Sequence, residues 1–184
     1  MKRVTLHDKT FECTIPEAEI LRRIDLLAEK LNRQWRGDGQ VPLFVSVLSG
    51  AFLFTAELLK RLDFTCEVAF VKLSSYRGTQ SAGEVAQVIG LEGHTVAGRE
   101  VIVLEDIVET GNTVEAVLRL LEPLRPDSVA FAVLFFKPEV YHKSIAIDHY
   151  AMELPAGFIV GFGLDYNQLG RNLRDIYTLV EGNS

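Results

Sequence analysis

Two adjacent carboxylates follow a short apolar run in the segment VIVLEDIVETGNTV, residues 101–114. Carboxylates about 4 Å apart repel each other by about 1 kcal/mol in water, and by several times more near a strand end of low dielectric. Folding alone does not require such a pair. Either Glu105 and Asp106 both accept hydrogen bonds from hydroxyl groups or face a cation, or only one of them matters and caps the next turn while the other faces water.

The turn that follows, TGNT, offers groups that could bind an anion. Gly111 lets a ligand approach the backbone, Thr110 and Thr113 provide hydroxyls, and the first N–H groups of the next helix carry the positive end of its dipole. The alternative is a simple strand-to-helix turn with a threonine cap. The two adjacent acids could accept hydrogen bonds from sugar hydroxyls, and the backbone amides of the turn could bind a phosphate. Together with the further carboxylate of Glu109, these groups indicate a site for ribose 5-phosphate.

The elements that would position these residues alternate between apolar strands and helical periodicity, which predicts an α/β fold with a parallel sheet covered by helices on both faces. We expect helices at residues 16–36, 51–62 and 114–124. We expect strands at residues 43–48, 66–73, 101–104, 129–136 and 158–161, the last as the final strand of the central sheet. Ligands bind at the carboxyl ends of such strands. Residues 79–84 (TQSAGE) are small and polar and are interpreted as a mobile loop.

The bulk properties of the chain exclude several classes of protein. A length of 184 residues suits one domain, residues 1–184, with a substantial core. The net charge of −6 argues against nucleic acid as the main partner. Neither a membrane-spanning run nor a signal peptide is recognisable, so we expect a cytoplasmic protein without a membrane partner. Cys13 and Cys66 match no metal or redox spacing and are expected to be reduced thiols.

The segment VIVLEDIVETGNT resembles the phosphoribosyl pyrophosphate (PRPP) motif of type I phosphoribosyltransferases. Its Glu-Asp start is most similar to the hypoxanthine-guanine phosphoribosyltransferases, which are purine-salvage enzymes. Four more segments resemble this family in its own order: VLSGAF (47–52), KLSSYRGTQSAGEV (72–85), FFKPE (135–139) and FIVGFGLDYNQLGRNL (158–173). In this order, they resemble the pyrophosphate loop of the family, its lid, the segment with the purine-binding lysine, and the base-stacking and metal-binding segment.

The resemblance implies the type I phosphoribosyltransferase fold, a central parallel sheet flanked by helices, with a small hood and a flexible lid loop. It also implies magnesium-dependent transfer of phosphoribosyl from PRPP to hypoxanthine, and to guanine, which gives IMP or GMP and pyrophosphate. These substrates and products are the expected partners, in a homodimer or homotetramer. The alternatives are a xanthine phosphoribosyltransferase, or a PRPP-sensing regulator that binds nucleic acid, which the acidic pI of 5.3 disfavours.

On the PRPP side, the resemblance assigns each group of the substrate to residues of this chain. Glu105 and Asp106 would hold the ribose hydroxyls, directly or through magnesium. The 5-phosphate would bind Glu109, Thr110, Gly111, Asn112 and Thr113. The pyrophosphate would bind to Ser49, Gly50, Lys72 and Arg171. Asp165 would hold a second magnesium on that group. A cis peptide is expected between Leu48 and Ser49, where the family commonly carries lysine in place of Ser49; the backbone role survives that change.

On the purine side, Lys137 would donate to O6, Phe158 would stack on the base, and the backbone of Ile159 would pair with the purine edge. Ser75 and Tyr76 would close over the reacting centre. Glu109 stands at the general-base position, which is usually aspartate, and its extra methylene moves the carboxylate by about 1 Å. From the residues alone, Lys137 could instead be a solvated lysine, Phe158 a core residue and Asp165 a turn-forming acid. A lysine donor disfavours adenine, whose 6-amino group is also a donor.

Overall fold

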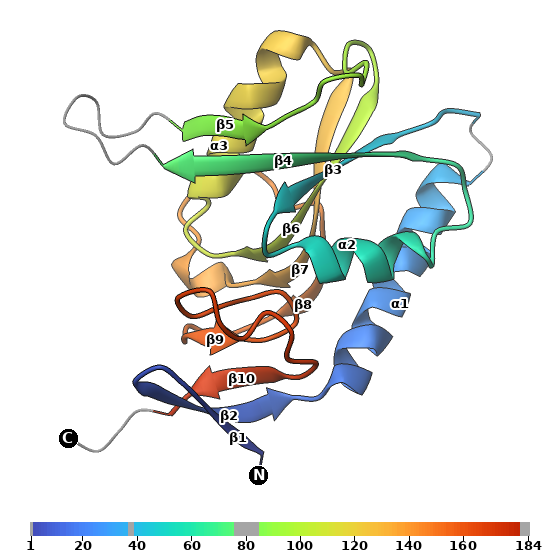
Figure 1. Ribbon diagram of the computed structural model, residues 1–184. Coiled ribbons are helices and arrows are strands. Elements are labelled where there is room, and N and C mark those ends of the chain that lie inside the picture. The colour runs from blue at the N-terminus through green and yellow to red at the C-terminus, as the bar shows by residue number, and fades with distance from the viewer. Residues whose placement is uncertain (1, 37–38, 76–84, 181–184) are drawn as a thin grey trace, which may run out of the picture.

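The computed structural model describes residues 2–36, 39–75 and 85–180, which form two sheets. The central sheet has six strands in the order β5-β4-β3-β6-β7-β8 (Figure 1). Their bounds are β3 Leu43–Leu48, β4 Glu67–Ser75, β5 Val85–Ile89, β6 Glu100–Val108, β7 Ser128–Phe136 and β8 His149–Glu153. All neighbours pair in parallel except β5, which runs antiparallel to β4.

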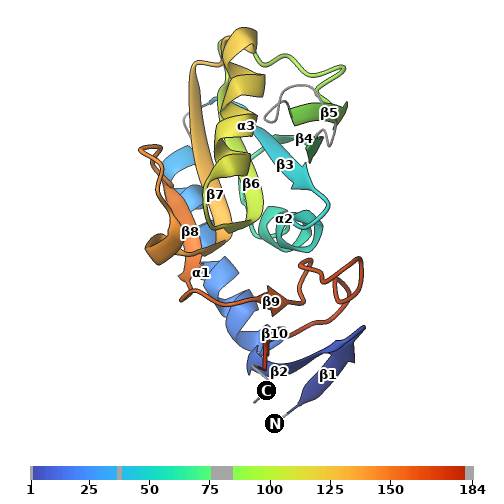
Figure 2. The ribbon, with the colours of Figure 1, turned by 90° about the vertical axis from the view of Figure 1, so that its left-hand side faces the viewer.

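Helices cover both faces of the central sheet, as the apolar strands predict (Figure 2). Helices α1 (Glu17–Trp35) and α2 (Phe52–Leu59) pack on one face, and α3 (Asn112–Leu121) packs on the other. The alternation of side chains along β6 divides the core: Ile102 and Leu104 belong to the cluster that contains residues of α1 and α2, whereas Val101 and Val103 belong to the cluster that contains residues of α3. Two short 3-10 helices follow α3 and β7, η1 at Glu122–Leu124 and η2 at Pro138–Val140.

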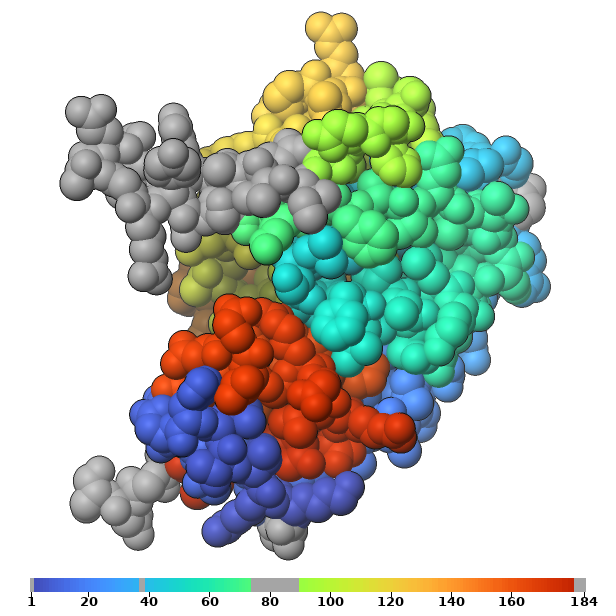
Figure 3. Space-filling view, in the orientation of Figure 1, coloured from blue at the N-terminus to red at the C-terminus, as the bar shows by residue number. Residues whose placement is uncertain are grey.

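The predicted hood is a second, antiparallel sheet of four strands that draws on both ends of the chain (Figure 1). Its order is β1-β2-β10-β9, with bounds β1 Arg3–Leu6, β2 Lys9–Ile15, β10 Ile176–Leu179 and β9 Ile159–Val160. In the space-filling view, this sheet and its loops, in blue and red, lie beside the central sheet, and the surface is recessed where the segment between β6 and α3 comes between them (Figure 3).

The structure corrects two of the expected strands. Residues 158–161 are not the last central strand, because Ile159 pairs with Thr178 in the second sheet, and β8 completes the central sheet instead. An apolar run indicates burial but not the sheet that provides it. Strand β6 also continues through the acid pair to Val108, since Ile107 and Val108 pair with β7. The helices predicted at 51–62 and 114–124 end at Leu59 and begin at Asn112, respectively.

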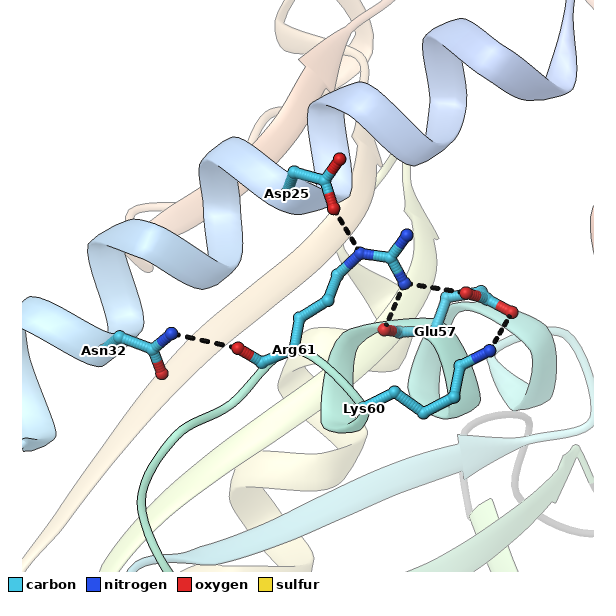
Figure 4. Close-up of polar contacts among 5 residues, drawn as sticks. All are labelled: Asp25, Asn32, Glu57, Lys60 and Arg61. Atoms are coloured by element: carbon cyan, nitrogen blue, oxygen red, sulfur yellow. Dashed lines mark hydrogen bonds and ion pairs between the residues drawn. The ribbon is translucent and has the colours of Figure 1, made fainter.

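A polar clamp fixes α2 against α1 (Figure 4). Arg61, just after α2, forms an ion pair with Asp25 of α1 and donates 2.7 Å hydrogen bonds to the carbonyl and carboxylate oxygens of Glu57. Asn32 of α1 donates to the Arg61 carbonyl at 2.9 Å, and Lys60 pairs with Glu57 at 2.7 Å. Because α2 begins directly after the 49–51 loop, the clamp also anchors one end of that loop.

Two smaller expectations concern the described part of the chain. Cys13 and Cys66 are free, as predicted. None of the helices in the described ranges has both the length and the apolar character required to cross a membrane.

Candidate functional site

The acid pair lies inside the protein at the carboxyl end of β6. Glu105 and Asp106 are each only 8% exposed, so the interpretation in which one carboxylate faces water is wrong. Glu105 lines a cavity of about 200 Å³ together with the 109–113 turn and the start of α3. The Asp106 carboxylate accepts the Ile107 N–H at 2.9 Å and lies against Gly50. The pair therefore connects the cavity before α3 with the loop before α2.

Burial makes both carboxyl groups reluctant to ionise. It raises the pKa of Glu105 well above its usual range, and the charge of Asp106 adds to this effect. Burial also raises the pKa of Asp106 to about 6, against the opposing effects of the Ile107 N–H and the positive charge of Arg171. A cation or a set of hydroxyl donors at this point would stabilise the ionised forms.

Three segments converge on Gly50. A β-carbon added to Gly50 would lie 1.6 Å from Asp106 Oδ2, and one added to Gly163 would lie 2.1 Å from the Gly50 carbonyl oxygen. Only glycine permits contacts this close. The peptide bond between Leu48 and Ser49 is cis, as predicted, and Ser49 is exposed. The loop after β3, the end of β6 and the 161–171 loop thus form one continuous surface.

The 109–113 turn presents backbone donors to the cavity. Gly111 has a left-handed φ of +84° and is the N-cap of α3, which has no side-chain cap, so the interpretation of a threonine-capped turn is wrong. The first N–H groups of a helix have no intrahelical partner and attract anions. Thr110 and Asn112 are exposed and Thr113 is half-buried, in the wall of the same cavity.

Lys137 lies buried directly after β7 and points at the turn. Its side chain is 2% exposed, so it is not a solvated lysine. Its ammonium forms an ion pair with Glu109 and donates to the Gly157 carbonyl at 2.6 Å. Its backbone N–H donates to the Val108 carbonyl at 3.0 Å. The half-exposed carboxylate of Glu109 is thereby held next to a buried ammonium.

An exposed aromatic ring adjoins Gly157. Phe158 is 44% exposed, so it is not a core residue. Its ring packs against Phe11 at 6.0 Å and edge-on to Tyr166 at 5.7 Å between centroids. Tyr166 is held in turn by Asp8, whose carboxylate accepts its hydroxyl at 2.8 Å. The sequence did not point to Phe11 and Tyr166 as supports, because Phe11 comes from β2 and Tyr166 from the 161–171 loop, and folding brings both to Phe158.

The 161–171 loop brings Asp165 and Arg171 together. They form an ion pair, and Arg171 Nη1 also donates to the Gly163 carbonyl at 2.7 Å. Asp165 Oδ2 accepts the Gln168 N–H at 2.7 Å, as a turn-forming acid would. Its role in metal binding stays a prediction.

The remaining predicted residues lie along β4 and β9. Lys72 is exposed and stands in register with Leu48, beside the cis peptide. Ile159 is half-buried and begins β9, directly after Phe158. Ser75 ends β4 opposite Val85, whereas Tyr76 and most of the predicted lid lie outside the described residues.

The carboxylates at this site could bind a divalent cation only if a bound substrate supplied further oxygen ligands. Within the described ranges, no three His, Cys, Asp or Glu side chains gather as a ready metal site. Magnesium, however, is usually bound by one or two carboxylates together with substrate oxygens and water. The buried pair of Glu105 and Asp106, with raised pKa values, has the chemistry for such a site.

Comparison with known proteins identifies relatives along most of the chain. Residues 16–167 match the phosphoribosyl transferase domain family. A hypoxanthine-guanine phosphoribosyltransferase of Streptococcus pyogenes is 36% identical over 90% of this chain and 91% of its own length. A hypoxanthine phosphoribosyltransferase of Escherichia coli is 32% identical over 89% of this chain and 92% of its own length. The crystal structure of a hypoxanthine phosphoribosyltransferase from Staphylococcus aureus superposes with a TM-score of 0.83, at 32% identity, over 92% of this chain and 91% of that one.

Proposed function

Because this chain belongs to the phosphoribosyl transferase family, we propose that it transfers the phosphoribosyl group of PRPP to hypoxanthine and guanine, giving IMP or GMP and pyrophosphate. The relatives support purine salvage by phosphoribosyl transfer. The choice of purine is argued from the residues of this chain.

One observation carries the proposal: a buried ammonium lies beside an exposed aromatic ring. Lys137 donates to the Gly157 carbonyl, and Phe158 is the next residue. An ammonium only donates hydrogen bonds, so it suits the O6 acceptor of hypoxanthine or guanine and opposes the 6-amino donor of adenine. A purine stacked on the open side of Phe158 would bring O6 toward Lys137 and its edge toward the Ile159 backbone.

PRPP would occupy the surface between the two sheets. Glu105 and Asp106 would accept hydrogen bonds from the ribose hydroxyls, and the 109–113 turn with the first N–H groups of α3 would bind the 5-phosphate. Backbone donors of Ser49 and Gly50, with the charges of Arg171 and Lys72, would receive the pyrophosphate. Glu105, Asp106 and Asp165 would hold magnesium, which when bound supplies positive charge to the departing pyrophosphate.

The proton chemistry would fall to Glu109. As the purine attacks C1, its nitrogen must lose a proton, and a carboxylate within reach can accept it. Lys137 holds the Glu109 carboxylate on the purine side of the turn, and this ion pair restricts the longer side chain that replaces the usual aspartate. Closure of Ser75 and Tyr76 over the centre would exclude water, which would otherwise hydrolyse PRPP.

We also propose that residues 1–184 act as one domain, because the site draws on both sheets. A cytoplasmic homodimer or homotetramer completes the proposal.

The test is pyrophosphate release by the purified protein with PRPP and magnesium, offered hypoxanthine, guanine, xanthine or adenine. We expect turnover with hypoxanthine and guanine and none with adenine. Lys137→Met should lower kcat/KM for hypoxanthine about 100-fold, because a charge-assisted hydrogen bond is lost and Glu109 is no longer held. Lys30→Met, at an exposed position on α1, is the matched control.

Two outcomes would contradict the proposal. Turnover confined to xanthine would assign another purine to the same fold. Tight PRPP binding without turnover of any base would indicate a PRPP-sensing protein.

A further inference from the structure

The segment after β7 contacts the 109–113 turn and α3 at three successive points. Lys137 pairs with Glu109 at the start of the turn. Farther along, Tyr141 and Lys143 pack on Gly111. Lys143 then pairs with Glu115, in the first turn of α3, at 3.0 Å. Neither Tyr141 nor Lys143 has a place in the proposed chemistry.

The contact on Gly111 is close and comes from side chains. A β-carbon added to Gly111 would lie 2.6 Å from Lys143 Cγ and 2.7 Å from Tyr141 Cε2. The methylene stem of Lys143 and the ring edge of Tyr141 therefore occupy the space beside the left-handed residue at the N-cap of α3.

Both covering side chains are themselves fixed. The Tyr141 hydroxyl donates to the Ile145 carbonyl at 2.6 Å, and its ring packs edge-on to Phe136 at 5.4 Å between centroids. The Lys143 side chain is only 27% exposed, and Glu115 holds its ammonium. A lysine often buries its stem while its charged end finds a partner at the surface, and here the stem covers the turn.

We propose that Lys143 is a positioning residue for the 5-phosphate, an inference that rests on the proposed function. Its stem holds Gly111 in place, and the ion pair with Glu115 fastens the stem to the helix whose N–H groups would bind the phosphate. The purine side does not depend on this contact. Loss of the stem therefore weakens ligands that carry the 5-phosphate and leaves ligands without it unaffected.

The experiment compares IMP with inosine, which differ only in the 5-phosphate, by calorimetric titration of the purified protein. Lys143→Ala removes the stem and should raise the Kd of IMP about tenfold, because displaced backbone donors lose well-aligned hydrogen bonds to the phosphate. Its inosine affinity should match that of the unsubstituted protein. Lys143→Met keeps most of the stem but loses the ion pair with Glu115, so it should raise the Kd of IMP by only about two- to threefold.

Arg119→Ala is the matched control. Arg119 is the other cation near Glu115, at 3.8 Å, but its side chain is 72% exposed. We expect this variant to bind IMP and inosine normally. Thermal unfolding of each variant shows that it is folded.

Any of three results would overturn the inference. Lys143→Ala could bind IMP with normal affinity, or it could lose affinity for IMP and inosine equally. Lys143→Met could bind IMP as weakly as Lys143→Ala does. If the unsubstituted protein turns over hypoxanthine with PRPP, such results count against the role of Lys143 alone. If it binds neither IMP nor PRPP, the proposed function fails and this inference fails with it.

Discussion

Replacing Asp106 by asparagine should make the ligand-free protein more stable while it weakens PRPP binding. Asparagine has the same shape, and its Oδ1 can still accept the Ile107 N–H, which Asp106 accepts at 2.9 Å. The substitution removes a carboxylate that is 8% exposed, next to Glu105. The charge serves the proposed ligand at the expense of the folded state, as is common at functional sites.

The magnitude follows from the pKa of Asp106, which burial raises from an ordinary value of 3.8 to about 6. A carboxyl group with a raised pKa in the folded state binds its proton more tightly there than in the unfolded chain. Its contribution to stability is therefore fully present below about pH 4 and is lost as the pH rises through about 6. The loss amounts to about 3 kcal/mol at pH 8 and to about half of that at pH 5.

Urea unfolding with a chelator present, at pH 8 and pH 5, measures this difference. We expect Asp106→Asn to exceed the unsubstituted protein by up to about 3 kcal/mol at pH 8 and by about half of that at pH 5. Asp127→Asn, at an exposed position, is the control and should change little at either pH. A variant less stable than the unsubstituted protein at pH 8, or a difference that does not depend on pH, would refute the reasoning.

Three further substitutions test other parts of the structure. Gly50→Ala places a β-carbon 1.6 Å from Asp106 Oδ2 and should lower kcat/KM for PRPP by about 100-fold, which pyrophosphate release would measure. Phe158→Ala removes the exposed ring and should raise KM for hypoxanthine about tenfold in the same assay, with KM for PRPP little changed. Arg61→Met breaks the clamp to Asp25 and Glu57 and should lower the free energy of unfolding by about 1–2 kcal/mol in urea, whereas Arg119→Met, in an exposed pair, should cost less than about 0.5 kcal/mol. An unchanged rate, an unchanged KM or an unchanged unfolding midpoint would contradict the first, second and third of these, respectively.

Local features of the site could be predicted from the sequence because neighbours along the chain form them. Strand β6, the 109–113 turn and α3 are consecutive, so apolar run, acid pair, small turn and helical pattern appear in one short segment. The cis peptide after β3 was expected only from the resemblance of the VLSGAF segment to the pyrophosphate loop of the family. The alternation of apolar strands and helices gave the class of fold, since burial on both faces is typical of parallel sheets.

Contacts between distant segments could not be predicted in this way. Hydrophobic periodicity indicates that a strand is buried but not which strand lies next to it, so the apolar run at 158–161 does not indicate that it pairs with β10 in the second sheet. The ion pair of Lys137 with Glu109, the approach of Gly163 to Gly50 and the cover of Lys143 over Gly111 join segments that are distant in the sequence and meet only in the folded chain.

The sequence by itself thus determined which chemical groups this protein has and the local turns that carry them. The tertiary structure decided which of those groups are buried, which are paired and which remain open to a ligand. The physical reason is that backbone preference and side-chain periodicity act over a few residues. Desolvation, ion pairing and close packing depend on atoms that the rest of the chain brings near.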